Sequence, residues 1–219
     1  MPSATPGQDL LPRGTLQPRP SPWQPVHALV LSIALAIGLW AGWDSREPEV
    51  LLKGDGPIYL ALSQSMESGH YRDEYLLGTP PHAKYPPAFP AWLIVVRKVA
   101  GDSPGAVHAT NLLLLALTAL LLADALRRIS SPWTGIGAAI VVAWNPVLLI
   151  RAGTVYSETL FTTLAALSLW AYLIADQGGG RRWRVVAGLA AVAGFLTRLP
   201  GILLLASLVG WESVRTRWK

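Results

Sequence analysis

The chain has 219 residues, of which 52% are hydrophobic and 14% charged, and its formal net charge is +5. Soluble domains carry about 25% charged residues, so this chain has too few charges to cover the surface of a globule. The positive charge does not predict nucleic-acid binding, because the basic residues stand in short clusters beside apolar runs. The sequence contains no cysteine, which excludes disulfides, thiol catalysis and cysteine-based metal sites.

The N-terminal part predicts a tail followed by a membrane anchor. Residues 1–25 are rich in proline, glycine and arginine, and we interpret them as a disordered cytoplasmic tail. The apolar run 26–43 is too long for the core of a signal peptide, and Trp40 and Trp43 occupy the place of a small-residue cleavage site. A transmembrane helix needs about 20 mostly apolar residues. We therefore expect run 26–43 to remain as the first span.

Further apolar runs predict an all-α fold, a polytopic transmembrane helical bundle. His108, Asn111 and Asp124 fall in the second run, and Arg198 stands in the middle of the last. None of the runs shows the polar stripe of a helix in a soluble bundle. We expect a transmembrane domain over residues 26–211 with about five spans, the last four at 106–126, 132–150, 157–175 and 185–211.

The positions of lysine and arginine predict the orientation. Arg127 and Arg128, and the cluster from Arg181 to Arg184, lie two spans apart, so they share one side with the N-terminus if segment 88–100 does not cross. That segment would rise only about 20 Å as a helix, which indicates an interfacial or re-entrant helix. We therefore predict a multi-pass protein of the plasma membrane with a cytoplasmic N-terminus.

With this orientation, two polar segments lie outside. They are the first extracytoplasmic loop, 44–105, and the short connection 151–158. The fifth span also ends outside, at 211. Segment 44–84 carries seven acidic against four basic residues, a local balance opposite to that of the whole chain. The positive-inside rule explains part of this difference, so the balance alone does not indicate a site.

Asp55 is the first candidate site residue in the loop. It precedes Pro57 and a predicted helix over 58–67, which has Tyr59, Leu62 and Met66 on one face and suits the membrane interface. The alternative interpretation of Asp55 is an ordinary N-cap.

A proline-rich stretch, 80–90, holds the next candidates, Lys84 and Tyr85. Proline fixes the backbone in an extended form, which would hold both side chains in place. The alternative is a stiff connector with an incidental lysine.

Glu158 and Arg198 are charged residues at or within predicted spans. Glu158 opens the fourth span, where a carboxylate either favours the helix N-terminus or serves a function. A cation deep in a span costs about 2.5–3.5 kcal/mol, so Arg198 indicates a functional role. The alternatives for Arg198 are a structural pair with Glu158 or Asp124, or snorkelling to the interface.

Four motifs together resemble a known family. They are GDGPIYL from Gly54, KYPPAFP from Lys84, SETLF from Ser157 and TRLPG from Thr197. Their order and spacing resemble the N-terminal portion of a membrane glycosyltransferase of the GT-C superfamily. In particular they resemble the protein-mannosyltransferase and aminoarabinose-transferase-like group (glycosyltransferase family 39, with the RgtA/B/C/D-like domain).

The resemblance implies transfer of a sugar from a polyprenyl-phosphate carrier to a hydroxyl of a protein, lipid or glycan, with inversion. It gives Asp55 the role of the catalytic base. Lys84, beside Tyr85, is the first candidate to bind the carrier phosphate, with Arg151 or Arg198 behind it. The surrounding membrane lipid is the other expected partner.

The resemblance also gives Glu158 a place near the carrier phosphate or a divalent metal. His82 could join it as a ligand, but the two residues are too few to predict a metal site. Family members usually continue through more spans, so we interpret residues 212–219 as a truncated end of an incomplete domain. Two other hypotheses stay open: a transporter or flippase fragment, from the intramembrane Asp124 and Arg198, and a non-catalytic membrane subunit.

Overall fold

The computed structural model describes residues 21–44, 54–73 and 76–217. Within these ranges the regular secondary structure is helical, with one isolated β-bridge between Arg72 and Pro81 and irregular connections between the helices. The prediction of an all-α fold is confirmed. The elements are α1 (Pro25–Asp44), α2 (Gly56–Glu67), α3 (Ala88–Ala100), α4 (Pro104–Ile129), α5 (Pro132–Ala143), α6 (Pro146–Ala152), α7 (Glu158–Ile174), η2 (Ala175–Gly179), α8 (Arg181–Thr197) and α9 (Gly201–Arg217).

Three helices begin with the same local chemistry, a short polar residue followed by proline. The side chains of Ser103, Ser131 and Asn145 accept hydrogen bonds from backbone N–H groups in the first turns of α4, α5 and α6. The proline that follows each of them has no N–H to leave unpaired and has the φ angle of a helix. These pairs of residues therefore fix where each helix starts.

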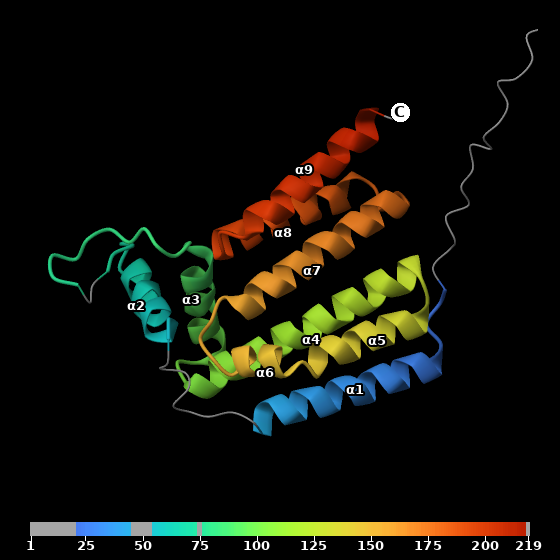
Figure 1. Ribbon diagram of the computed structural model, residues 1–219. Helices are drawn as coiled ribbons and strands as arrows, with labels where there is room; N and C mark the ends of the chain where they lie inside the picture. Colours follow the sequence, from blue (N-terminus) through green and yellow to red (C-terminus); the bar gives the residue numbers. More distant parts are fainter. Residues whose placement is uncertain (1–20, 45–53, 74–75, 218–219) are drawn as a thin grey trace, which may run out of the picture.

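The long helices run side by side, and α2 and α3 lie across one end of the bundle (Figure 1). Small residues bring α4 and α5 close together, and Ala119, Ala123 and Ala139 are completely buried. A Cβ added to Gly135 would lie 2.3 Å from the carbonyl oxygen of Ala123, so only glycine permits this approach. Close backbone contact through small residues is typical of helices that associate in a membrane.

The bundle has two chemically different ends. We call one the basic end: there Arg127 and Arg128 bind Asp124, and Arg128 also contacts Gln177. We call the other the site end: there α2, α3 and the start of α7 meet the turn between α8 and α9 (Figure 1). The Arg127–Arg128 and Arg181–Arg184 clusters thus share one end, as the predicted topology requires.

In the part of the chain that the structure describes, three helices are long and apolar enough to cross a membrane: α1, α4, and α7 together with η2. A fourth crossing is formed if α5 and α6 count as one span, although a bend of 55° separates them. The predicted third span, 132–150, is therefore not one straight helix. The bend lies at Asn145 and Pro146, because proline cannot donate the helical hydrogen bond at that position.

The prediction of a single fifth span over 185–211 is wrong. α8 ends at Thr197, and α9 starts at Gly201 and runs back beside α8 (Figure 1). Pro200 has no N–H for the carbonyl four residues earlier, and its ring would clash with that carbonyl, so α8 cannot continue through it; the backbone becomes extended at Arg198. Glu212 pairs with Arg184 at 3.4 Å, so α9 returns to the basic end, and the predicted crossing to the other side by residue 211 is also wrong.

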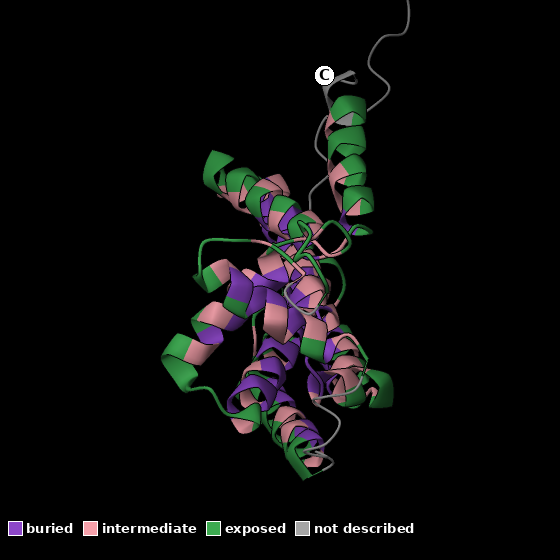
Figure 2. Cartoon of the chain, turned by 90° about the vertical axis from the view of Figure 1, so that its left-hand side faces the viewer, coloured by how far each residue is buried: buried purple, intermediate pink, exposed green. Residues whose placement is uncertain are grey.

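α9 is the least covered of the long helices (Figure 2). It packs mainly against α8 and leaves large apolar side chains exposed, among them Ile202, Leu203, Val209 and Trp211. Exposed apolar residues of this kind suit contact with lipid.

The N-terminal tail was predicted over residues 1–25. Residues 1–20 lie outside the described part of the chain, and helix α1 already begins at Pro25.

Candidate functional site

A cavity of about 200 Å³ opens at the site end. Four segments that are far apart in the sequence line it: the start of α2, the proline-rich stretch, the start of α7, and the turn between α8 and α9. Its lining residues are Asp55, Tyr59, Lys84, Tyr85, Pro86, Tyr156, Ser157, Glu158, Thr197, Arg198, Leu199 and Pro200. Five of the six predicted site residues thus meet in one place.

Asp55 stands directly before α2, at the N-cap position, but its side chain makes no capping hydrogen bond. Its backbone carbonyl accepts the first helical hydrogen bond, from the N–H of Tyr59 at 3.0 Å. The N-cap interpretation of the carboxylate is therefore not supported, and the side chain lines the cavity instead. α2 starts at Gly56, two residues before the predicted start.

The buried face of α2 fixes the start of the helix against the bundle. Tyr59 and Leu62 are 4% and 0% exposed, and the ring of Tyr59 lies 4.8 Å from the rings of Tyr85 and Phe89. The Tyr59 hydroxyl hydrogen-bonds Ser157 Oγ at 3.1 Å. This face was predicted to meet the membrane interface, but it packs against protein. Burial raises the pKa of Tyr59, outweighing the hydrogen bond from Ser157, which lowers it.

Lys84 and Tyr85 lie at the edge of the cavity, as the rigid proline-rich stretch predicted. Lys84 is exposed, with its Nζ 4.7 Å from the centre of the Tyr85 ring. The hydroxyl of Tyr71 donates to the backbone carbonyl of Tyr85 at 2.8 Å. Burial raises the pKa of the Tyr85 phenol, and the nearby Asp55 carboxylate contributes to the rise.

Glu158 and Arg198 form an ion pair, with 2.6 Å between Oε1 and Nη1. Of the alternatives for Arg198, the structure therefore supports the pair with Glu158. The second carboxylate oxygen of Glu158, Oε2, is buried and has no hydrogen-bond partner in the described part of the chain. Because Arg198 occupies the turn after α8, its predicted place in the middle of a span is wrong.

Asp124 lies at the basic end, away from this cavity. Arg127 and Arg128 bind its carboxylate, and the indole Nε1–H of Trp170 donates to it at 2.9 Å. The two polar residues on which the transporter hypothesis rests are therefore at opposite ends of the bundle, and each is paired.

Arg151, the sixth predicted residue, does not line the cavity. Its guanidinium lies 4.8 Å from the ring centre of Tyr156. Tyr156 lines the cavity, and Arg151 packs against the Tyr156 ring. An arginine over an aromatic ring is stabilised by the ring's negative face.

His82 uses both ring nitrogens within the protein. Nδ1 binds the carboxylate of Asp73, and Nε2 accepts the backbone N–H of Tyr85 at 2.8 Å. It is therefore not free to join Glu158 as a metal ligand. Among the residues that the structure describes, no group of three or more histidine, aspartate or glutamate side chains is placed to bind a metal ion.

Several residues of the site were not predicted. Tyr156, Ser157 and Thr197 line the cavity. Ser157 and Thr197 begin two of the four motifs, but tyrosine, serine and threonine are common at helix ends, so their residue type alone predicts no role. Asn111 carried a signal, since it interrupts an apolar run. Its Nδ2 donates to the carbonyl oxygens of Ala152 and Thr154, at 3.1 and 2.9 Å. These bonds hold the connection that leads into Glu158.

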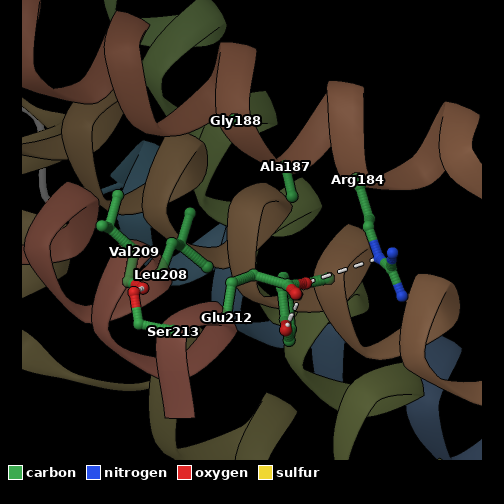
Figure 3. A pocket seen from close by; sticks show the side chains of 8 residues that line it. Arg184, Ala187, Gly188, Leu208, Val209, Glu212 and Ser213 are labelled. Carbon is green, nitrogen blue, oxygen red and sulfur yellow. Dashed lines mark hydrogen bonds and ion pairs between the residues drawn. The ribbon is translucent and has the colours of Figure 1, made fainter. Parts of the chain in front are cut away.

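A second cavity, of about 460 Å³, lies between α8 and α9 toward the basic end (Figure 3). Its lining is mainly apolar and includes Ala187, Gly188, Leu208 and Val209. Glu212 stands at its polar edge and accepts a hydrogen bond from Tyr172 at 2.8 Å. None of the predicted site residues lines this cavity, so we place the candidate site at the other end.

A comparison with protein families identifies the family of the chain. The family of dolichyl-phosphate-mannose-protein mannosyltransferases matches residues 84–217. The chain belongs to this family. It is therefore an integral membrane protein and a membrane glycosyltransferase of the GT-C type. The match covers Lys84, Glu158 and Arg198, whereas Asp55 and α2 precede it. No curated protein and no solved structure matches the chain.

Proposed function

We propose that the chain transfers a sugar from a polyprenyl-phosphate carrier to an acceptor hydroxyl, with Asp55 as the general base. The observation that carries this proposal is the meeting of Asp55, Lys84, Glu158 and Arg198 around one cavity at the site end. The carboxylates and cations come from four separate segments, so their meeting is a property of the fold and not of one motif.

In the proposed reaction, the acceptor oxygen attacks the anomeric carbon of the donor sugar while its proton moves to the Asp55 carboxylate. The bond between the anomeric carbon and the phosphate oxygen breaks, and polyprenyl phosphate leaves with the electron pair. Attack from the opposite face inverts the configuration. General-base catalysis of this kind contributes about 10²–10⁴-fold. Asp55 suits this role because its side chain makes no N-cap hydrogen bond.

Lys84 and Arg198 are the proposed binding groups for the carrier phosphate. Negative charge grows on that phosphate as the bond breaks, and fixed cations stabilise such charge. Lys84 is exposed at the cavity edge, while Arg198 is held by Glu158. Tyr85 would line the path between them. Arg151 is a weaker candidate because it lies behind Tyr156.

Glu158 is the proposed partner of a hydroxyl on the donor sugar or the acceptor. Its Oε2 is buried without a hydrogen-bond partner among the described residues, and leaving such an atom unpaired costs about 1–3 kcal/mol. A ligand hydroxyl in the cavity would remove this cost. A divalent metal could satisfy the same oxygen, and its addition is one arm of the assay.

We propose that the site end faces the extracytoplasmic side and that the N-terminus is cytoplasmic. The cluster Arg127 and Arg128 and the residue Arg184 are at the basic end, which the positive-inside rule assigns to the cytoplasm. The donor sugar, carried on a membrane lipid, would then meet the acceptor outside the cell.

The test is transfer from a panel of radiolabelled polyprenyl-phosphate sugars by the purified chain in lipid nanodiscs, with and without Mg²⁺ or Mn²⁺. Asp55→Asn should lower the rate at least 10²-fold while the protein remains folded. The matched control is Asp102→Asn, which removes an exposed acid that binds Arg97 outside the cavity. A wild-type rate in Asp55→Asn would remove Asp55 from the mechanism.

A further inference from the structure

His82 has a buried side chain whose two ring nitrogens bind different partners. Its side chain is 2% exposed. Nε2 accepts the backbone N–H of Tyr85 at 2.8 Å, so the ring proton is on Nδ1, which donates to the carboxylate of Asp73. The carboxylate thereby selects the tautomer that can accept from Tyr85. This is the arrangement by which an acidic residue orients a histidine.

The side chains around His82 hold Tyr85 from several directions. Its N–H is bound by His82, its carbonyl accepts from the Tyr71 hydroxyl at 2.8 Å, and its ring stacks on the His82 ring with an interplanar angle of 7°. The backbone of His82 is fixed in turn, since its N–H donates to the carbonyl of Tyr71 at 2.9 Å. Segment 71–73 and the proline-rich stretch are thus joined at several points.

The local sequence explains why side chains, and not backbone groups, hold Tyr85 in place. Pro80, Pro81, Pro86 and Pro87 have no N–H, so backbone hydrogen bonds to segment 71–73 are confined to the isolated bridge beside Pro81 and do not extend to Tyr85. Tyr85 is one of the residues of the stretch that keep a backbone N–H, and this is the group that His82 binds. A rigid site needs neighbouring groups that lock its residues in place.

We propose that Asp73 and His82 are positioning residues that hold Tyr85 and Lys84 at the edge of the cavity. Neither residue lines the cavity itself. Asp73 fixes the tautomer of His82, and His82 fixes the backbone of Tyr85, from which Lys84 extends toward the carrier phosphate. The effect on donor binding rests on the proposed function, whereas the clamp itself does not.

Two substitutions separate the two tasks of His82. In His82→Gln, the amide oxygen can take the place of Nε2 and accept the N–H of Tyr85. In His82→Asn, the amide nitrogen can take the place of Nδ1 and donate to Asp73, but nothing reaches Tyr85. We expect His82→Asn to raise the KM for the polyprenyl-phosphate sugar about tenfold, with kcat changed less than threefold, and His82→Gln to keep KM within about threefold.

The matched controls are His70→Gln and His70→Asn, because His70 belongs to the same loop and is exposed. Neither should change KM. Asp73→Asn, which no longer selects one tautomer, should raise KM by an intermediate factor. Equal losses of kcat in His82→Gln and His82→Asn, with equal falls in thermal stability, would overturn the proposal.

Hydrogen exchange of the peptide that contains Tyr85, measured by mass spectrometry on the full chain in nanodiscs, tests the clamp without any assay of transfer. Exchange should be about tenfold faster in His82→Asn than in the wild type and unchanged in His82→Gln. Wild-type exchange in His82→Asn would overturn the clamp. If this exchange pattern is found but the wild type transfers no sugar, the clamp stands and only the proposed function fails.

Discussion

Arg198 and Glu158 form an ion pair that joins two segments of the fold. Glu158 opens α7, and Arg198 occupies the turn between α8 and α9, so their 2.6 Å contact connects three helices at the edge of the cavity. One oxygen of Glu158 is used in this pair, while the other is buried and unpartnered among the described residues. The pair therefore has a structural task and leaves a group available to a ligand.

Removing the charge of Arg198 should affect both stability and transfer. Arg198→Gln leaves the Glu158 carboxylate without its cation, and for a pair about one third exposed we expect a loss of about 1 kcal/mol, or about 2–4 °C in the unfolding midpoint. In the double variant Glu158→Gln/Arg198→Gln, two neutral amides can pair, so the midpoint should recover. Transfer should not recover, because the cation is absent. Differential scanning fluorimetry and the transfer assay measure the two quantities, and joint recovery would assign the pair a structural role alone.

Gly54 should tolerate no side chain. Its φ is +65°, and an added Cβ would lie 1.7 Å from the Tyr156 hydroxyl, at the wall of the cavity next to Asp55. We expect Gly54→Ala to lower transfer more than tenfold. Gly69→Ala is the matched control, since φ is +84° there and nothing lies within 4 Å of the added Cβ. Gly54→Ala/Tyr156→Phe should recover part of the rate, because the closest atom is removed; a rate equal to that of Gly54→Ala would contradict the steric explanation.

The sequence predicts the elements of this fold better than its turns. The apolar runs that became α1, α4 and α7 were long and mostly apolar, and length and composition alone identify such helices. Run 185–211 was just as apolar, but Pro200 and Gly201 divide it into two antiparallel helices. Apolar content cannot distinguish one long span from a helical hairpin. The local signal was Pro200, because proline cannot donate the helical hydrogen bond and clashes with the preceding turn of a helix.

Most of the site residues that could be predicted are charged, because a charge in or beside the membrane has a high free-energy cost. Most of the uncharged polar residues of the site could not be predicted. Arg198 and Glu158 were identified because a charged side chain near hydrocarbon is unfavourable and usually has a functional or structural role. Tyr59 and Ser157 were not, because their hydrogen bond joins residues 98 positions apart. His82 was weighed as a metal ligand, and only its contacts with Asp73 and Tyr85 reveal the other use of its nitrogens.

Asn111 should be essential for the stability of the connection between α6 and α7. Its amide donates to two buried carbonyl oxygens, of Ala152 and Thr154. Asn111→Leu has a similar volume but leaves the Thr154 carbonyl unpaired and leaves the Ala152 carbonyl with only its 3.2 Å contact to His108 Nδ1, so we expect a loss of about 1–3 kcal/mol, seen as a lower unfolding midpoint. Thr110→Val is the control, because the Thr110 hydroxyl bonds only to a carbonyl of its own helix that the helix already uses. An unchanged midpoint in Asn111→Leu would show that these hydrogen bonds add nothing.

The phenol of Tyr71 should ionise only at unusually high pH. Burial, and after it the neighbouring Tyr59 and Asp73, raise its pKa from 10.0 to about 12. Between these values the unfolded chain loses the proton of Tyr71 while the folded chain keeps it, so its contribution to stability is complete below pH 10 and is lost as pH rises through 12. The difference in tyrosinate absorbance between the wild type and Tyr71→Phe isolates this group and should appear near pH 12. A difference that appears near pH 10 would show that Tyr71 is solvated and that its hydrogen bond to the Tyr85 carbonyl is not maintained.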